Sequence, residues 1–532
     1  MRMKTMARML GLPLLLASTA WMPARAADAQ TLRIGAAAAV TSADPLFYNF
    51  TPNINLASHV FERLVDRDAR ARPRPGLAES WRLISDTVWE FKLRPGAKWQ
   101  DGQDFTAEDV AFTISRVPNV PNSPGSYAGF VRTIERVEVI DPLTVRLHTK
   151  RPNPLLPVEL GSVSIVSRHV GETATTADYN SGKAAIGTGP YRLVSFRPNE
   201  QAELVRNDAY WGGQVPWARV IYRTIPNDGA RVAALLAGDV DMADQIPSAN
   251  VARLQRDARV VLSQSPAFRV IYLQPGFAHD GELPFATDRN GKPLPRNPLR
   301  DVRVRRALSI AINRAALAER VMEGGAVPNG QWLPEGAYSY DPTIPVPAYD
   351  PDGARRLLAE AGFPEGFRLT LHTPNDRYPN DAKVAQAIAQ TWTRAGIATQ
   401  VEALPWTSYV SRYSKQEFAI WLVGWGNSTG EATSMLVNIL GTPDRSISRG
   451  AANSSRYSNP ELDAMTERAT TTLDDAKRED LLREAVRTAI NDVALIPLFQ
   501  VANTWGLRAG LHHEARMDER TSAVDVTPAA GK

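Results

Sequence analysis

The chain has 532 residues, of which 43% are hydrophobic and 22% charged, the proportions of an ordinary globular protein and not of a disordered or membrane protein. Its formal net charge of +4 comes entirely from residues 1–26, which hold four basic residues and no acidic one. The neutral remainder argues against a nucleic-acid partner. The absence of cysteine excludes disulfides, thiolate metal sites, a cysteine nucleophile and a lipid anchor on cysteine.

Residues 1–26 have the pattern of a secretory signal peptide. A basic start precedes the apolar run from Met9 to Ala20, and Ala24-Arg25-Ala26 supplies small residues at the cleavage positions. The run is too short to span a membrane, because a span takes roughly 20 apolar residues. We expect cleavage after Ala26, with Ala29 as a second possibility, and a mature protein that is free of the membrane.

The most informative stretch is residues 77–110, which combines a strand, two turns and a helix. In the strand, Val88 to Leu93, apolar and charged residues alternate with the period of two that a half-buried strand shows. Pro and Gly then supply turn chemistry at residues 94–96 and 101–102. Thr106 is predicted to cap the helix that follows, with Asp109 three residues on.

The rest of the first half is predicted to hold short strands and turns. A strand covers Thr31 to Gly35, and Val137 to Ile140 pairs with Val145 to His148 as a hairpin. The Gly-rich stretch Gly187 to Tyr191 fits neither GxGxxG nor a P-loop, so we expect a structural turn. A helix from Gly229 to Ala237 ends at a glycine.

The second half alternates strands and helices beyond a Pro- and Gly-rich linker at residues 281–298. This pattern predicts βαβ units and a mainly parallel sheet, with ligands bound beyond the carboxyl ends of its strands. The expected elements are helices opened by Asp301 and by Asp350-Pro351, strand 368–373, helix 381–395, strand 397–403, a helix after Pro405 and strand 418–423.

Two clusters of polar residues are given structural interpretations. Arg300, Arg303, Arg305 and Arg306 alternate with core positions of an amphipathic helix, so we expect a solvated face and not a nucleic-acid site. The seven histidines show no metal-ligand spacing, and we predict neither a metal site nor a cofactor. The neighbours His512 and His513 are placed in a polar C-terminal tail.

One motif indicates an enzyme. Residues 426–430 spell GxSxG after a predicted strand, as the nucleophile elbow of a serine hydrolase does, with Ser428 as the nucleophile. No HGGG-type oxyanion segment precedes it, and its later histidines fall in the predicted tail. We therefore predict no catalytic residue, and keep a hydrolase that uses Ser428 as an alternative.

Seven motifs in order resemble the extracytoplasmic solute-binding proteins of peptide-type ABC importers, bacterial family 5. They are LAESW at 77–81, DGQDFTAEDV at 101–110, GTGPY at 187–191, YWG at 210–212, DVRVRRAL at 301–308, YDPDGARRLLAEAG at 349–362 and NSSRYSNPELD at 453–463. The resemblance implies an α/β fold of the type II periplasmic-binding-protein kind, with two lobes, a ligand cleft between them and an additional α+β domain.

The resemblance also implies domain boundaries. Lobe I is expected to combine residues 27–66, 184–280 and 496–532. The accessory domain II covers 67–183, and lobe III covers 281–495. The ligand is expected to sit between the lobes and to close them by a hinge motion.

In peptide-binding relatives a Gly-Trp-Gly-like turn presents backbone groups to the ligand, and an Asp downstream holds its α-ammonium. Gly424, Trp425 and Gly426 match the turn, but Ser428 stands in the position of that Asp. Burying an ammonium without a charged partner is costly. Glu431 is therefore predicted to replace the Asp from one helical turn away, unless the ligand has no free α-amino group.

Five further residues are predicted to bind the ligand. Asn375, Arg377 and Tyr378 follow the strand that ends at residue 373, and the arginine could clamp a carboxylate. Tyr127 lies where relatives reach across the cleft, and Asp44 follows the first strand.

The resemblance implies a monomeric periplasmic receptor that captures a small solute and delivers it to a membrane permease and its ATPase. Short peptides are the leading cargo. Opine-like conjugates, modified peptides, oligosaccharides and a nickel complex are alternatives within the family.

Overall fold

The computed structural model describes residues 31–427, 429–447 and 449–529. The predicted signal peptide, residues 1–26, and Ser428 lie outside these residues. Within the described part of the chain, no helix combines the length and the apolar character needed to cross a membrane.

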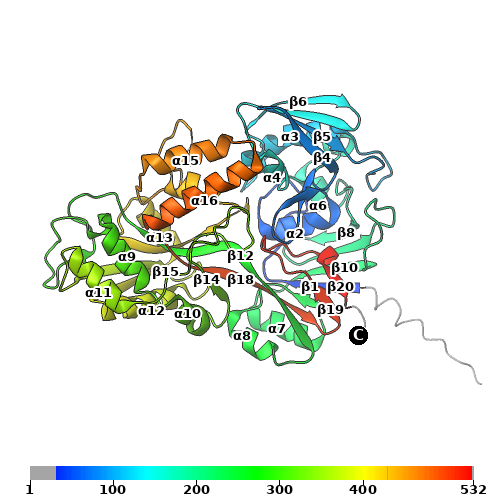
Figure 1. Cartoon of the computed structure of the whole chain (residues 1–532). Coiled ribbons are helices and arrows are strands. Elements are labelled where there is room, and N and C mark those ends of the chain that lie inside the picture. The colour runs from blue at the N-terminus through cyan, green and yellow to red at the C-terminus, as the bar shows by residue number, and fades with distance from the viewer. Residues whose placement is uncertain (1–30, 428, 448, 530–532) are drawn as a thin grey trace, which may run out of the picture.

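A mixed sheet of twelve strands runs through the molecule (Figure 1). Its main order is β13 (Ala286–Thr287), β15 (Phe367–Pro374), β17 (Ile420–Gly426), β12 (Val260–Pro275), β18 (Ile496–Arg508), β11 (Met242–Ala243), β1 (Thr31–Ala36), β10 (Arg219–Thr224), β9 (Gln201–Arg206) and β8 (Tyr191–Arg197). Strand β14 (Ala326–Pro328) joins β18, and β16 (Ile397–Leu404) joins β15. The long antiparallel strands β12 and β18 cross the middle and connect the two lobes of the expected fold.

The parallel unit expected in the second half is present, but it is part of a larger mixed sheet. Strand β15 pairs in parallel with β16 and β17, as the alternation of strands and helices predicts. Strands β12, β13 and β14 come from outside that alternating stretch, and each joins its neighbour in the antiparallel direction. The result is a parallel unit added to an antiparallel core.

A second, four-stranded antiparallel sheet has the order β4 (Ala78–Ser85), β5 (Val88–Leu93), β7 (Thr144–Thr149) and β6 (Ile134–Asp141). It lies with α3 (Ala107–Arg116) at the top of Figure 1. The predicted strand coincides with β5, and Thr106 and Asp109 form the predicted capping box of α3. The division of the chain into domains at residues 67, 184, 281 and 496 stays a prediction.

Among the described residues, six longer helices pack around the sheet of the second half (Figure 1). They are α9 (Val302–Ile310), α11 (Pro351–Glu360), α12 (Asp381–Arg394), α13 (Trp406–Ser414), α15 (Pro460–Thr471) and α16 (Asp475–Asn491). The other half holds α2 (Thr51–Val60), α4 (Leu156–Leu160), α5 (Arg168–Gly171), α6 (Thr176–Asn180), α7 (Asp228–Ala237) and α8 (Ser248–Leu254).

The solvated face predicted for α9 is wrong at one position. Arg305 is only 3% exposed, and its guanidinium donates to the backbone oxygens of Asp492 and Val493 beyond the end of α16. These carbonyl groups are left without partners inside the helix, so a buried arginine satisfies them.

The C-terminal segment folds back onto the first half and is not the polar tail that we expected. It forms a two-stranded sheet of β19 (Leu511–His513) and β20 (Val526–Pro528). His513 is 6% exposed and packs against Trp505, with 4.8 Å between the ring centroids. Apolar and polar residues alternate in this segment, so its apolar side chains point to one face, and that face is buried.

A buried histidine fixes this segment to α2. The Nδ1–H of His59 donates to the Asn55 carbonyl at 2.8 Å, and Nε2 accepts from the Ala523 N–H at 2.9 Å. The ring is fully buried, and burial lowers its pKa to about 4. Both ring nitrogens are satisfied only in the neutral form, because a proton on Nε2 would remove the acceptor.

We therefore expect acid to destabilise the folded state between about pH 6.5 and pH 4. The pKa of His59 is about 4 in the fold and 6.5 in the unfolded chain, so only the unfolded chain takes up a proton there. Acidification from pH 7 to pH 5 should cost on the order of 2 kcal/mol through this group.

Urea unfolding of the wild type and of His59→Gln at both pH values measures the effect. The glutamine can donate and accept but does not titrate, so the variant should lose part of the pH dependence. An unchanged pH dependence would contradict this linkage.

Candidate functional site

Three cavities meet where β17 ends against β12. The aromatic cavity, of about 360 Å³, contains the ends of β15 and β17 in its lining. The arginine cavity, of about 230 Å³, lies among α2, β2 (Val65–Arg67) and the C-terminal segment. The broad cavity, of about 620 Å³, lies between residues 228–249 and residues 322–325 and 377–383. Arg269 lines all three, so the three cavities adjoin at this side chain.

An irregularity in β12 creates this meeting point. The register between β12 and β18 shifts between Pro266 and Val270. Such a shift locally bends a strand and redirects its side chains. Arg269, inside the shift, pairs instead with Gly426 of β17.

The turn predicted to contact the ligand borders the aromatic cavity. Gly424, Trp425 and Gly426 all line it, and each pairs with β12 on one side. On the other side, β15 pairs with β17 only at Ile420 and Trp421. The last residues of β17 therefore present a strand edge to the cavity, the geometry in which an extended peptide can add as a further strand.

Tyr378 and Gly424, both predicted to bind the ligand, lie together, and their role in binding stays a prediction. The Tyr378 hydroxyl donates to the Gly424 carbonyl at 3.2 Å. A Cβ on Gly424 would lie 2.8 Å from Tyr378 Cε1 and 2.8 Å from Ile271 Cδ1, closer than such atoms approach. Glycine is thus required here for the close approach of the two side chains.

A wall of aromatic side chains, which the sequence analysis did not identify, completes this cavity. Trp406 and Tyr413 of α13 and Trp421 of β17 all line it. Tyr413 stacks on Trp421 with centroids 6.2 Å apart, and Tyr409 is buried behind Trp406. The aromatic residues of α13 recur at intervals of three and four, the signal of one helix face. The sequence does not show that this face borders a cleft.

The charged groups of the aromatic cavity are both cationic. Its lining contains Arg269 and Arg377 and no carboxylate among the described residues. The guanidinium carbon of Arg377 lies 5.1 Å from the ring centre of Trp406, a cation–π distance. Arg269 approaches Glu519 at 3.9 Å.

Three predicted site residues lie outside the aromatic cavity. Asn375 is exposed beyond β15, with its backbone N–H donating to Leu404. Asp44 is 1% exposed and holds Arg116 of α3 at 2.6 and 3.1 Å. Tyr127 is 2% exposed and its hydroxyl reaches the Tyr48 carbonyl at 3.4 Å. Their contacts connect parts of the fold, and their role in binding stays a prediction.

Glu431 is engaged within the protein. It is 2% exposed, and its carboxylate forms an ion pair with Arg478 of α16, which also contacts Thr433. Its backbone oxygen accepts from the side-chain amide of Asn427 at 2.5 Å. This charge is already neutralised, so the placement of Glu431 gives no support to its predicted role as an ammonium partner. Ser428 lies outside the described residues.

No group of three or more His, Asp or Glu side chains among residues 31–427, 429–447 and 449–529 is arranged to hold a metal ion. His513 is engaged elsewhere, since its Nδ1 contacts the Ser263 hydroxyl at 3.0 Å.

Comparisons with known proteins agree with this geometry. The model of the bacterial extracellular solute-binding proteins, family 5, matches residues 72–446. Heme-binding protein A of Haemophilus influenzae is 27% identical over 470 residues, covering 83% of this chain and 82% of that protein. The dipeptide-binding protein of Escherichia coli is 26% identical over 439 residues, covering 77% and 78%.

The fold also matches a solved structure. HbpA2 from Haemophilus parasuis superposes with a TM-score of 0.81 at 23% identity, covering 94% of this chain and all of that one. The two-lobe fold expected from the resemblance is thus confirmed.

We expect Glu431→Gln to destabilise the protein by about 3 kcal/mol or more, because it leaves Arg478 as a buried charge without a partner. Urea unfolding of the ligand-free protein measures the loss. The exposed Glu282→Gln is the matched control and should change stability by less than about 0.5 kcal/mol. An unfolding free energy equal to that of the control would show that the ion pair does not contribute.

Proposed function

We propose that this chain is the substrate-binding receptor of an ABC importer for short peptides or peptide-like solutes. The premise is that it belongs to the bacterial extracellular solute-binding proteins of family 5. Proteins of this family are the substrate-binding components of ABC importers. The proposal for the cargo is carried by one observation: the strand edge of β17 lies beside an aromatic wall in the aromatic cavity.

This arrangement suits a peptide for physical reasons. An extended ligand along β17 would satisfy its backbone through main-chain hydrogen bonds, which do not depend on its sequence. The side chains would then pack on Trp406, Tyr413 and Trp421, whose broad apolar faces accept different shapes. The dipeptide-binding relative supports the same cargo.

The remaining roles follow from the same premise. The receptor works as a monomer in the periplasm, reached through a cleaved signal peptide, and without a lipid anchor. Ligand binding favours the closed form, which docks on the permease and its ATPase at the inner membrane. Opine-like conjugates, modified peptides, oligosaccharides and a nickel complex are the alternative cargoes within the family.

We expect the purified protein to carry its cargo. Native mass spectrometry should show a series of masses above the protein that, after unfolding, resolves into peptides of a few residues. The expectation rests on the sequence-independent backbone contacts that β17 offers. A single non-peptide mass, such as a heme or a nickel complex, would overturn the peptide proposal and leave the receptor role standing.

We expect no enzymatic use of Ser428. Wild type and Ser428→Ala should both hydrolyse p-nitrophenyl acetate no faster than buffer, and the variant should lose at most some affinity for peptide. Hydrolysis by the wild type that disappears in Ser428→Ala would identify a serine hydrolase instead.

A further inference from the structure

The arginine cavity has a charge that none of the roles above uses. Its lining contains four arginines and only two carboxylates among the described residues. The arginines are Arg63, Arg67, Arg269 and Arg520, and the carboxylates are Asp518 and Glu519. The lining therefore has a formal excess of positive charge.

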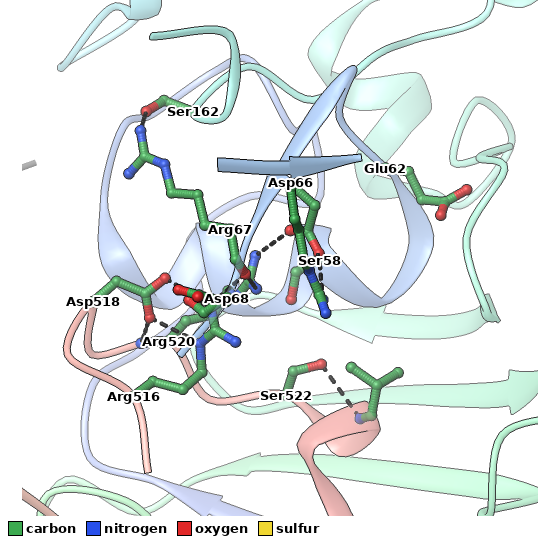
Figure 2. A network of polar contacts seen from close by, with 12 residues as sticks. Ser58, Glu62, Asp66, Arg67, Asp68, Ser162, Arg516, Asp518, Arg520 and Ser522 are labelled. Atoms are coloured by element: carbon green, nitrogen blue, oxygen red, sulfur yellow. Dashed lines mark hydrogen bonds and ion pairs between the residues drawn. The ribbon is translucent and has the colours of Figure 1, made fainter. Parts of the chain in front are cut away.

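Both carboxylates are already engaged. The two oxygens of Asp518 each accept from Arg516 at 2.9 Å, as Figure 2 shows. Glu519 faces Arg269 at 3.9 Å. The nearby Asp66 is shared by Arg74 at 2.6 Å and by Arg520 at 3.4 Å. None of these three carboxylates forms an ion pair with one further guanidinium of the lining.

That guanidinium belongs to Arg63, just beyond α2. Arg63 is 7% exposed, and its Nε is buried without a hydrogen-bond partner. Within the described residues, no carboxylate lies within ion-pair distance of it, and the more distant Asp66 offsets its charge only through space. Burial lowers its pKa to about 10, the direction expected of a desolvated cation. A buried arginine of this kind is costly unless an anion completes it.

Two further arginines line the same cavity. The Arg67 guanidinium donates to the Val158 carbonyl at 2.7 Å and to the Ser162 hydroxyl at 2.8 Å (Figure 2). The Nε of Arg520 is buried and has no hydrogen-bond partner. A guanidinium that is fixed by hydrogen bonds, as that of Arg67 is, loses little conformational freedom when it binds an anion.

The backbone adds to the same polarity. Helix α2 has ten residues, its N-cap Phe50 makes no side-chain capping bond, and Thr51 of its first turn lines the cavity. The N-terminus of a helix carries partial positive charge and free N–H groups.

The arginine cavity adjoins the aromatic cavity at the end of β17, because Arg269 and Gly426 line both. A ligand extended along β17 would therefore place its end among these arginines. This is the end at which the resemblance leads one to expect an ammonium, and positive charge there would repel it.

We propose that the arginine cavity binds an oxyanion, a carboxylate or phosphate group, carried by the end of a ligand that lies along β17. The preferred cargo is then an acidic peptide conjugate without a free α-ammonium. The cargo part rests on the proposed function, whereas the oxyanion site does not.

The first experiment tests the site without any peptide. Succinate and inorganic phosphate are titrated at fixed ionic strength while thermal unfolding is followed for the wild type, Arg63→Met and the exposed surface control Arg197→Met. Both anions should raise Tm saturably in the wild type and in the control. Arg63→Met should have a higher Tm than the wild type without anion and should not respond to either one. Equal responses of wild type and Arg63→Met would overturn the site.

The second experiment tests the cargo by calorimetry with Ala-Ala, N-acetyl-Ala-Ala and N-succinyl-Ala-Ala. The succinyl form should bind at least tenfold more tightly than the acetyl form, and the free amine most weakly. Arg63→Met should remove the succinyl preference and keep acetyl binding, and Arg63→Lys should restore part of the preference. Equal affinities for all three forms, or tightest binding of the free amine, would overturn the acidic-cargo inference. Anion binding without any peptide binding would uphold the site and overturn the peptide function.

Discussion

The antiparallel pairing of β12 with β18 is the constraint on which the rest of the structure depends. Its register runs from Val260 opposite Arg508 to Leu273 opposite Ile496, so one ribbon reaches from the first half into the second. Strand β11 pairs with one end of this ribbon, and β17 pairs with the other. The shift in register between these ends places Arg269 where the three cavities meet. The three cavities therefore adjoin along a ribbon that connects the two halves of the sheet.

The local elements could be predicted because their causes lie within a few residues. The capping box of Thr106 and Asp109, the alternation along β5 and the left-handed glycine after α7 each depend on neighbours in the sequence. The sheet direction could not be predicted in the same way. Periodicity identifies a strand but not its partner, and the partners of β12 lie more than 140 residues away.

Some residues of the aromatic cavity could be proposed from local sequence. The arginine cavity could not, because distant segments of the chain form it. Gly424 and Tyr378 were proposed because each follows a predicted strand, and both line the aromatic cavity. Arg63 and Arg520 escaped because 457 positions separate them in the chain, and a lone arginine normally indicates a solvated surface. Glu431 was proposed as a ligand contact from its position after Ser428. Its ion pair with Arg478 could not be predicted, because the sequence does not show that α16 packs beside residue 431.

The proposed anion site would couple charge to the closing motion expected of this fold. When the lobes close, water leaves the cavities and every unpaired charge inside becomes more costly. Arg63 is already buried, and its Nε has no hydrogen-bond partner among the described residues. Closure without an anion would therefore increase the free-energy cost of keeping this cation out of water. A ligand that supplies the anion removes this cost in the closed form more than in the open form, and a ligand shifts an equilibrium only by such a difference. If the proposed anion site is correct, the same buried arginine disfavours closure of the empty receptor and favours closure of the loaded one, the form expected to dock on the permease.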